Sequence, residues 1–160
     1  MYEQIKNEFK GFKSVKELRM SLNDVPKKKG VYIVIRDKET KPKFVEIGTG
    51  GYFKGKNPNV SIEKLEKEWV DGSPIVYIGQ TGNTLRERIE TLLKFGKGEN
   101  KGHWGGRLMW QLEDAEDLLI AWKELPNDDP EELEKRLIDE FECNYNRLPF
   151  ANLKRGTSKK

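Results

Sequence analysis

The chain has 160 residues, of which 35% are hydrophobic, 10% aromatic and 36% charged, and its formal net charge is +3. This length and apolar content suit one domain with a buried core and argue against a disordered chain. No apolar run approaches the length of a membrane span and the start of the chain lacks a signal-peptide pattern, so we expect a cytoplasmic protein without a membrane partner. The single cysteine, Cys143, excludes a disulfide framework within one chain and a zinc site built from cysteines.

The charged residues are unevenly distributed along the chain. Basic residues cluster at 27–29, between Lys94 and Lys101, and in a basic tail at 154–160, whereas acidic residues gather at 113–117 and 128–134. A basic side opposite an acidic side would suit an anionic polymer as partner. The alternative is that these runs are solvated surfaces and a frayed tail.

The first 25 residues predict a helical extension ahead of the main domain. Ser14 and Glu17 have the spacing of a capping box, and Leu18 and Leu22 provide its apolar stripe. A β-rich run, GVYIVI, follows, with a strand predicted over 31–35. A turn over 37–42 and an apolar run at 44–47 then predict a partner strand and hence a hairpin. Residues 48–58 form a glycine-rich loop, and 61–69 are expected to be a short helix.

A second strand is predicted over 74–78, before a helix that begins after Thr84 and continues to about Leu93. A basic glycine-rich loop over 96–106, a helical stretch over 108–112 and a third strand over 118–122 follow. Asp129 and Pro130 predict a strong helix start, with the helix extending to about Glu142. The sum is a small α+β domain over 26–153, with about three mostly antiparallel strands flanked by helices and an insertion at about 36–72.

Two tripeptides, GVY at 30–32 and YIG at 77–79, occupy the first two main strands. LRERI follows the second strand on a helix start and places an arginine at 88. Glu134 then precedes Leu137 and Ile138 on a later helix, and an asparagine at 152 follows Pro149. In this order the five elements resemble the GIY-YIG nuclease family, over roughly residues 25–153, which is nearly the whole chain.

The resemblance implies a metal-dependent endonuclease that hydrolyses phosphodiester bonds of DNA, most often double-stranded. It implies that Tyr32 activates the attacking water, that Tyr77 lies beside it and that Asn152 braces the site. Arg88 would bind phosphate through its forked donors, and Glu134 would hold one Mg²⁺ or Mn²⁺. A phenol with a pKa near 10 is a poor base, so a nearby cation is expected to lower the pKa of Tyr32.

Several residues have competing interpretations. Arg86 is the alternative to Arg88, and Asn146 is the alternative to Asn152. His103, the single histidine, lies in the loop where many family members carry a histidine or lysine, and could take a proton from Tyr32 or contact phosphate. Leu92 stands where the family often has a polar or aromatic residue, so a second proton-handling group would have to be His103 or Lys94.

The sequence also permits less specific functions. One is a nucleic-acid-binding module of the same fold without nuclease activity, which the basic clusters and Leu92 would favour. Another is a protein-interaction domain whose contact surface uses Trp104, Trp110 and Trp122. Cutting both strands of a duplex would usually require a homodimer, but no residue pattern determines the oligomeric state.

Overall fold

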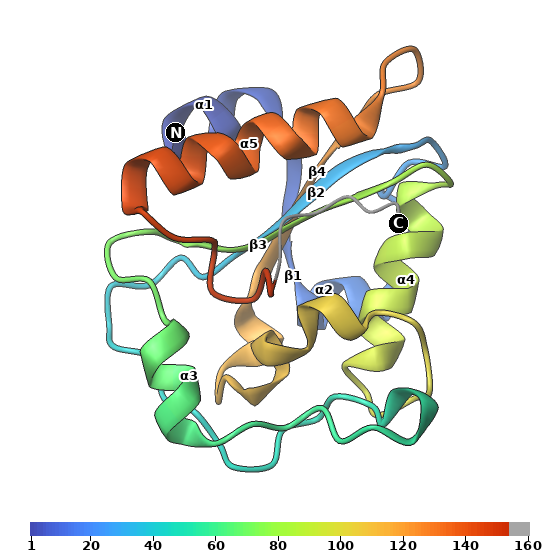
Figure 1. The fold of residues 1–160 in the computed structure, drawn as a ribbon. Coiled ribbons are helices and arrows are strands. Elements are labelled where there is room, and N and C mark those ends of the chain that lie inside the picture. The colour runs from blue at the N-terminus through green and yellow to red at the C-terminus, as the bar shows by residue number, and fades with distance from the viewer. Residues whose placement is uncertain (154–160) are drawn as a thin grey trace.

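The computed structural model describes residues 1–153, and its centre is a four-stranded antiparallel sheet with helices on both faces (Figure 1). The strands are β1 (Lys10–Ser14), β2 (Gly30–Ile35), β3 (Ile75–Thr81) and β4 (Leu119–Glu124), in the order β1-β4-β2-β3. The α+β class and the antiparallel sheet are therefore confirmed, with one strand more than the sequence predicts. The predicted basic tail at 154–160 lies outside the described residues.

Five α-helices and three short 3₁₀ segments surround the sheet. They are α1 (Tyr2–Glu8), α2 (Val15–Met20), α3 (Ile62–Glu68), α4 (Leu85–Phe95) and α5 (Pro130–Tyr145), with η1 (Phe53–Gly55), η2 (Trp104–Gln111) and η3 (Ala115–Asp117). The predicted start signals are confirmed. Ser14 and Glu17 form the full capping box, Thr84 accepts a hydrogen bond from the Glu87 amide, and Asp129 accepts one from Glu131 with Pro130 in the first turn.

The expectation that the first 25 residues are helical is wrong for residues 10–14. This segment is β1, which pairs with β4 at the sheet edge opposite β3. Its pairing is interrupted where Gly11 and Phe12 adopt positive φ values of 95° and 54°. A bulged strand of five residues shows no alternation of apolar and polar positions, which is the pattern that would have predicted it.

The predicted hairpin between 31–35 and 44–47 is also wrong. All six residues of β2 are buried, and its two edges are taken by β3 and β4. Phe44 forms only an isolated bridge with Leu112 and packs against the rings of Trp69 and Phe150. A strand buried on both faces belongs in the middle of a sheet, where distant segments of the chain supply its neighbours.

The sheet divides the hydrophobic core into two layers. On one face, α1 and α5 cover alternate residues of β2, including Val31 and Ile33. On the other face, α2, α4 and η2 cover Tyr32 and Val34. Because β3 is the strand at one end of the order, elements from both faces can approach its outer edge.

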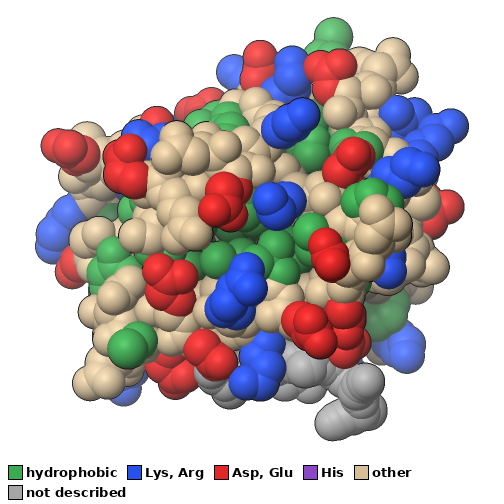
Figure 2. Space-filling view, turned by 90° about the horizontal axis from the view of Figure 1, so that it is seen from above, with side chains coloured by type: hydrophobic (Ala, Val, Ile, Leu, Met, Phe, Trp, Pro, Cys, Tyr) green, Lys and Arg blue, Asp and Glu red, His purple; other side chains and the backbone are tan. Residues whose placement is uncertain are grey.

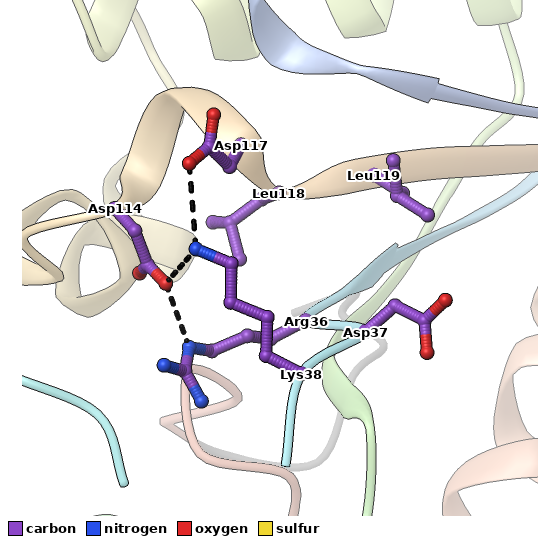
Figure 3. A pocket seen from close by; sticks show the side chains of 7 residues that line it. All are labelled: Arg36, Asp37, Lys38, Asp114, Asp117, Leu118 and Leu119. Atoms are coloured by element: carbon purple, nitrogen blue, oxygen red, sulfur yellow. Dashed lines mark hydrogen bonds and ion pairs between the residues drawn. The ribbon is translucent and has the colours of Figure 1, made fainter. Parts of the chain in front are cut away.

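The segment between β2 and β3 is anchored at its start by a group of ion pairs (Figure 3). Arg36, which is buried, donates to Asp114 Oδ2 at 3.0 Å, and Lys38 contacts Asp114 at 2.9 Å and Asp117 at 3.4 Å. Burial alone would raise the pKa of Asp114, but Lys38 and Arg36 more than offset it, so that pKa is lowered. The insertion is thus tied to the turn that precedes β4.

The face covered by α1 and α5 carries acidic and basic side chains side by side (Figure 2). No single sign of charge dominates this view, so the predicted basic side does not lie here. Within residues 1–153, no helix has the length and apolar character needed to cross a membrane.

Candidate active site

Tyr32 of β2 and Tyr77 of β3 lie on the same face of the sheet. Tyr32 pairs with Gly79, and Val34 pairs with Tyr77, so positions 77 and 79 share the face that carries Tyr32. A register shift between Val34 and Ile35 leaves Val76 as an extra residue in β3. The two phenol rings are 6.0 Å apart between centroids, and both are buried. The two tripeptides therefore form one site.

Gly79 makes room for this pair of rings. A Cβ atom at this position would lie 2.6 Å from Cζ and 2.7 Å from the hydroxyl of Tyr32, and 2.7 Å from Cε2 of Tyr77. These separations are far inside van der Waals contact. The glycine that ends the YIG tripeptide is thus required by close packing of side chains, because its φ is not in the left-handed region.

His103 completes a buried cluster with the two tyrosines. Its Nε2 lies 2.7 Å from the hydroxyl of Tyr32, and its ring centroid lies 5.5 Å from that of Tyr77. The side chain is fully buried, and its Nδ1 has no hydrogen-bond partner among the described residues. Burial, with a smaller effect of Arg88, lowers the pKa of His103 to about 3. The imidazole is therefore neutral near pH 7 and can exchange a hydrogen bond with Tyr32.

The pKa values of both phenols are raised, contrary to the expectation for Tyr32. Burial is the largest cause for each, and the pKa of Tyr77 is raised well above its ordinary value. Arg88 lowers the pKa of Tyr32, but by less than burial raises it, and Glu134 raises it further. The phenols are therefore neutral in the free protein.

Of the two arginines on α4, only Arg88 serves this cluster. Arg88 lowers the pKa values of Tyr32, Tyr77 and His103, which places its charge close to all three. Its Nη1 donates to the carbonyl of Gly102 at 2.8 Å. Arg86 instead donates to the carbonyls of Val25 at 2.8 Å and Asn23 at 3.0 Å, so it holds the loop that leads into β2.

Glu134 lies on α5, which covers the opposite face of the sheet from Tyr32, and acts on the cluster through its charge. Its charge raises the pKa values of Tyr32 and Tyr77, and only 6% of the residue is exposed. Burial, reinforced by Glu131, raises the pKa of Glu134 itself to about 7. Within residues 1–153, no hydrogen bond or ion pair holds its carboxylate. A buried carboxylate of this kind attracts a cation.

Asn152 and Asn146 have different structural tasks. Asn152, which is buried, accepts a hydrogen bond from the Ile78 amide and donates one to the Ile78 carbonyl, both at 2.9 Å. It therefore fixes the backbone next to Tyr77. Asn146 is the exposed residue that ends α5 in the left-handed conformation, with φ 63° and ψ 24°.

Neither Leu92, where the family often has a polar or aromatic residue, nor Lys94 takes part in the cluster. Leu92 is fully buried in the hydrophobic core, and Lys94 pairs with Glu90 at 3.3 Å on the surface of α4. His103 is thus the residue that the fold brings to Tyr32. The Gly102 carbonyl, which orients Arg88, was not predicted, because a backbone acceptor leaves no sequence signal.

Glu134 provides the carboxylate beside the cluster that could hold a hard divalent cation. Among residues 1–153 there is no group of three or more His, Cys, Asp or Glu side chains that could hold a metal. Structural and catalytic zinc sites need such a set. Mg²⁺, in contrast, is usually held by one or two carboxylates together with water and substrate phosphate, and the isolated buried carboxylate of Glu134 suits that arrangement.

Comparisons of the chain with models of protein families, with curated proteins and with solved structures found no match in any of the three.

Proposed function

We propose that the chain is a GIY-YIG endonuclease that hydrolyses DNA phosphodiester bonds with the help of Mg²⁺ or Mn²⁺. The observation that carries the proposal is the gathering of five separated side chains: Tyr32 bonds to His103 at 2.7 Å, Tyr77 adjoins both, and Arg88 and Glu134 act electrostatically on the same phenols. Phosphodiester hydrolysis needs a positively charged side chain that binds phosphate, a carboxylate that holds a metal ion and a pair of groups that transfers a proton.

Tyr32 and His103 form the proton relay in this proposal. As water attacks phosphorus, the hydroxyl oxygen of Tyr32 takes the proton of the water, and the Tyr32 proton passes to Nε2 of His103. The bond between phosphorus and the leaving deoxyribose oxygen breaks, and that oxygen takes its proton from solvent water. Protonation of His103 is costly in the free protein, because burial and Arg88 both oppose it. A phosphate bound to Arg88 offsets the charge of the guanidinium and so reduces one of these two costs.

Arg88, Glu134 and Asn152 support that step. Arg88 binds the non-bridging phosphate oxygens through the guanidinium nitrogens that do not bond Gly102. Glu134 would hold the cation, which supplies positive charge against the negative charge that develops on the phosphate oxygens. Asn152 keeps the backbone of Ile78, and with it Tyr77, in register.

The decisive experiment is incubation of the purified chain with plasmid DNA, with Mg²⁺ or Mn²⁺ and with EDTA. We expect nicked or linear DNA only with the metal, and its loss in Glu134→Ala and Tyr32→Phe. Lys135→Ala, an exposed neighbour on α5, is the matched control and is expected to cleave normally. Cleavage that persists in EDTA or in Glu134→Ala would falsify the mechanism. Cutting of both strands by one site per chain would require two copies of the protein.

The alternative is a nucleic-acid-binding module of the same fold that does not cleave. It is favoured by Leu92, which is apolar and fully buried where the family often has a polar or aromatic residue, and by the raised pKa values of both phenols. It predicts DNA binding that weakens with salt and no metal-dependent cleavage with any DNA.

A further inference from the structure

Two loops beside the site combine aromatic and basic side chains. The first, residues 48–58 of the insertion, carries Tyr52, Phe53, Lys54 and Lys56, and the second, residues 96–107, carries Trp104 and Arg107. We refer to these six side chains as the loop surface. In Figure 1, η1 of the first loop lies beneath the end of α4, beside the second loop.

The two loops are packed tightly against each other. A Cβ atom at Gly51 would lie 2.1 Å from the Glu99 carbonyl oxygen, so the backbones touch there. The Lys54 amide donates to Oδ1 of Asn100 at 3.1 Å. The ring of Phe53 lies against Gly102, where Cζ would be 3.6 Å from an added Cβ atom. The insertion therefore has a defined place on the loop that follows α4.

The same packing joins the loop surface to the candidate active site. Gly102, against which Phe53 packs, gives its carbonyl to Arg88, and the next residue, His103, bonds to Tyr32. The residue that Phe53 touches is thus the immediate neighbour of the proton relay. A polymer whose phosphate lies on Arg88 could therefore reach this surface.

The chemistry of the surface fits nucleotides. The guanidinium of Arg107 lies 4.2 Å from the ring centroid of Trp104, and the ammonium of Lys56 lies 5.9 Å from it. Tyr52 is 53% exposed, which is high for an aromatic residue. The two loops contain five basic residues against one acidic residue, Glu99. These five cations form no ion pair with another residue of 1–153.

We propose that the loop surface binds an unpaired DNA segment that continues from the scissile phosphate, with bases stacked on the aromatic rings and phosphates on the cations. This inference rests on the proposed nuclease site and deepens it, because it names DNA with a single-stranded segment next to a duplex as the substrate. The exposed ring of Tyr52, beside the partly exposed rings of Phe53 and Trp104, favours the unpaired strand over a blunt duplex, because paired bases hide their faces inside the helix. Unpaired cations beside those rings favour a polyanion over an apolar protein partner.

The test compares three fluorescent DNAs in anisotropy titrations without divalent cation: a short oligothymidylate, a blunt duplex and the same duplex with a single-stranded overhang. We expect the overhang to raise affinity. Tyr52→Ala and Trp104→Leu should each weaken overhang binding at least about fivefold and leave blunt-duplex binding unchanged. The double variant Lys54→Ala, Lys56→Ala should reduce the slope of log K against log salt concentration. The reduction should be about 0.7 for each phosphate that the variant no longer binds.

Two matched controls make these results specific. Met20→Ala removes a residue that is 86% exposed on α2, and Lys10→Ala removes a cation from β1, at the far edge of the sheet. Neither is expected to change binding of any of the three DNAs. Because Tyr52 is exposed, Tyr52→Ala keeps the test decisive even if Trp104→Leu does not fold.

The inference is overturned if the overhang adds no affinity, if the loop variants weaken all three DNAs equally, or if the wild-type chain binds no DNA and the surface serves a protein. The failure of this inference can be distinguished from the failure of the nuclease proposal. Metal-dependent cleavage with no effect of Tyr52→Ala overturns the inference alone. Tyr52-dependent binding of the overhang without cleavage of any DNA overturns the nuclease function alone.

Discussion

At the scale of single residues, Gly79 controls where the two phenols can lie. Because an added Cβ atom would be 2.6 Å from the ring of Tyr32, Gly79→Ala must displace Tyr32 or Tyr77. We expect DNA cleavage to fall by about 100-fold, as for other losses of active-site geometry, and stability to fall by about 1–3 kcal/mol, as for overpacking in a core. Plasmid cleavage and urea unfolding measure the two effects.

Gly82→Ala is the matched control for that substitution. Gly82 follows β3 by one residue, has nothing within 4 Å of an added Cβ atom and does not have a left-handed φ. Its alanine variant should cleave and unfold as the wild type does. Equal behaviour of the two alanine variants would show that the tyrosines are not held by Gly79.

Glu134 predicts a pH dependence of both stability and cleavage. Its folded pKa of about 7 exceeds its ordinary value of 4.5, so the folded state favours the protonated carboxyl. Without metal, its contribution to stability is full below about pH 4.5 and is lost as the pH rises through about 7. Glu134→Gln, which stays neutral, should therefore stabilise the protein at pH 8 and have little effect at pH 4. Thermal unfolding in EDTA at the two pH values measures this.

The same carboxylate should set the rise of cleavage with pH. Holding a cation requires the ionised form, so the rate is expected to increase through about pH 7 at low metal concentration and to reach its plateau at lower pH as metal is added. His103 stays neutral over this range, since its pKa is about 3. A rate that is independent of pH between 5 and 8 would contradict the role of Glu134.

The candidate site residues could be predicted from the sequence more readily than their protonation states. The ordered motif singled out Tyr32, Tyr77, Glu134 and the other proposed residues, because residue type and spacing are visible in one dimension. The raised pKa of Tyr32 was not predictable, because it depends on burial by segments distant in the chain. The sequence left two roles open for His103, proton transfer with Tyr32 or contact with phosphate. Only the fold, which joins these residues 71 positions apart by a 2.7 Å hydrogen bond, places the histidine against Tyr32.

At the scale of elements, substitutions of the two arginines on α4 are predicted to differ: that of Arg86 mainly lowers stability, and that of Arg88 mainly lowers cleavage. Arg86 bonds two backbone carbonyls of the loop before β2, so Arg86→Met should cost about 2 kcal/mol of stability and retain cleavage in the fraction that is folded. Arg88→Met loses one such bond, to Gly102, and should cost about 1 kcal/mol while reducing cleavage about 100-fold or more. Urea unfolding and plasmid cleavage of both variants decide the assignment, and the reverse pattern would make Arg86 the phosphate ligand.

Elements with local signals were predictable, and those defined by distant partners were not. α5 begins at Asp129 and Pro130 because capping and proline geometry act within a few residues. The neighbours of β2 are β3 and β4, and no feature of GVYIVI itself selects them over the nearby run at 44–47. The bulged β1 carries Gly11, whose added Cβ atom would lie 2.5 Å from the ring of Trp122, a proximity that only the folded chain creates.

At the scale of the whole molecule, the end of the described chain packs along the outer edge of β3, beside the candidate site. After α5, the chain returns to β3, where the amide of Ala151 donates to the Val76 carbonyl and Asn152 bonds both backbone groups of Ile78. This covers part of the edge strand, whose backbone would otherwise be open to pairing with another chain. Phe150, beside it, is buried against Trp69 and Phe44.

Asn152→Ala tests whether this contact at the sheet edge supports the candidate site. The substitution leaves the amide and the carbonyl of Ile78 without their side-chain partner, and each buried group that loses its partner costs about 1–3 kcal/mol. We expect a loss of about 2–6 kcal/mol in urea unfolding, faster hydrogen exchange of the Ile78 amide and weaker cleavage, because Tyr77 is the preceding residue. Leu153→Ala, at a position that is 36% exposed, is the control and should change none of the three. If the Ile78 amide exchanged no faster in Asn152→Ala, the C-terminal segment would only cover the sheet edge, and Tyr77 would be positioned by the sheet itself.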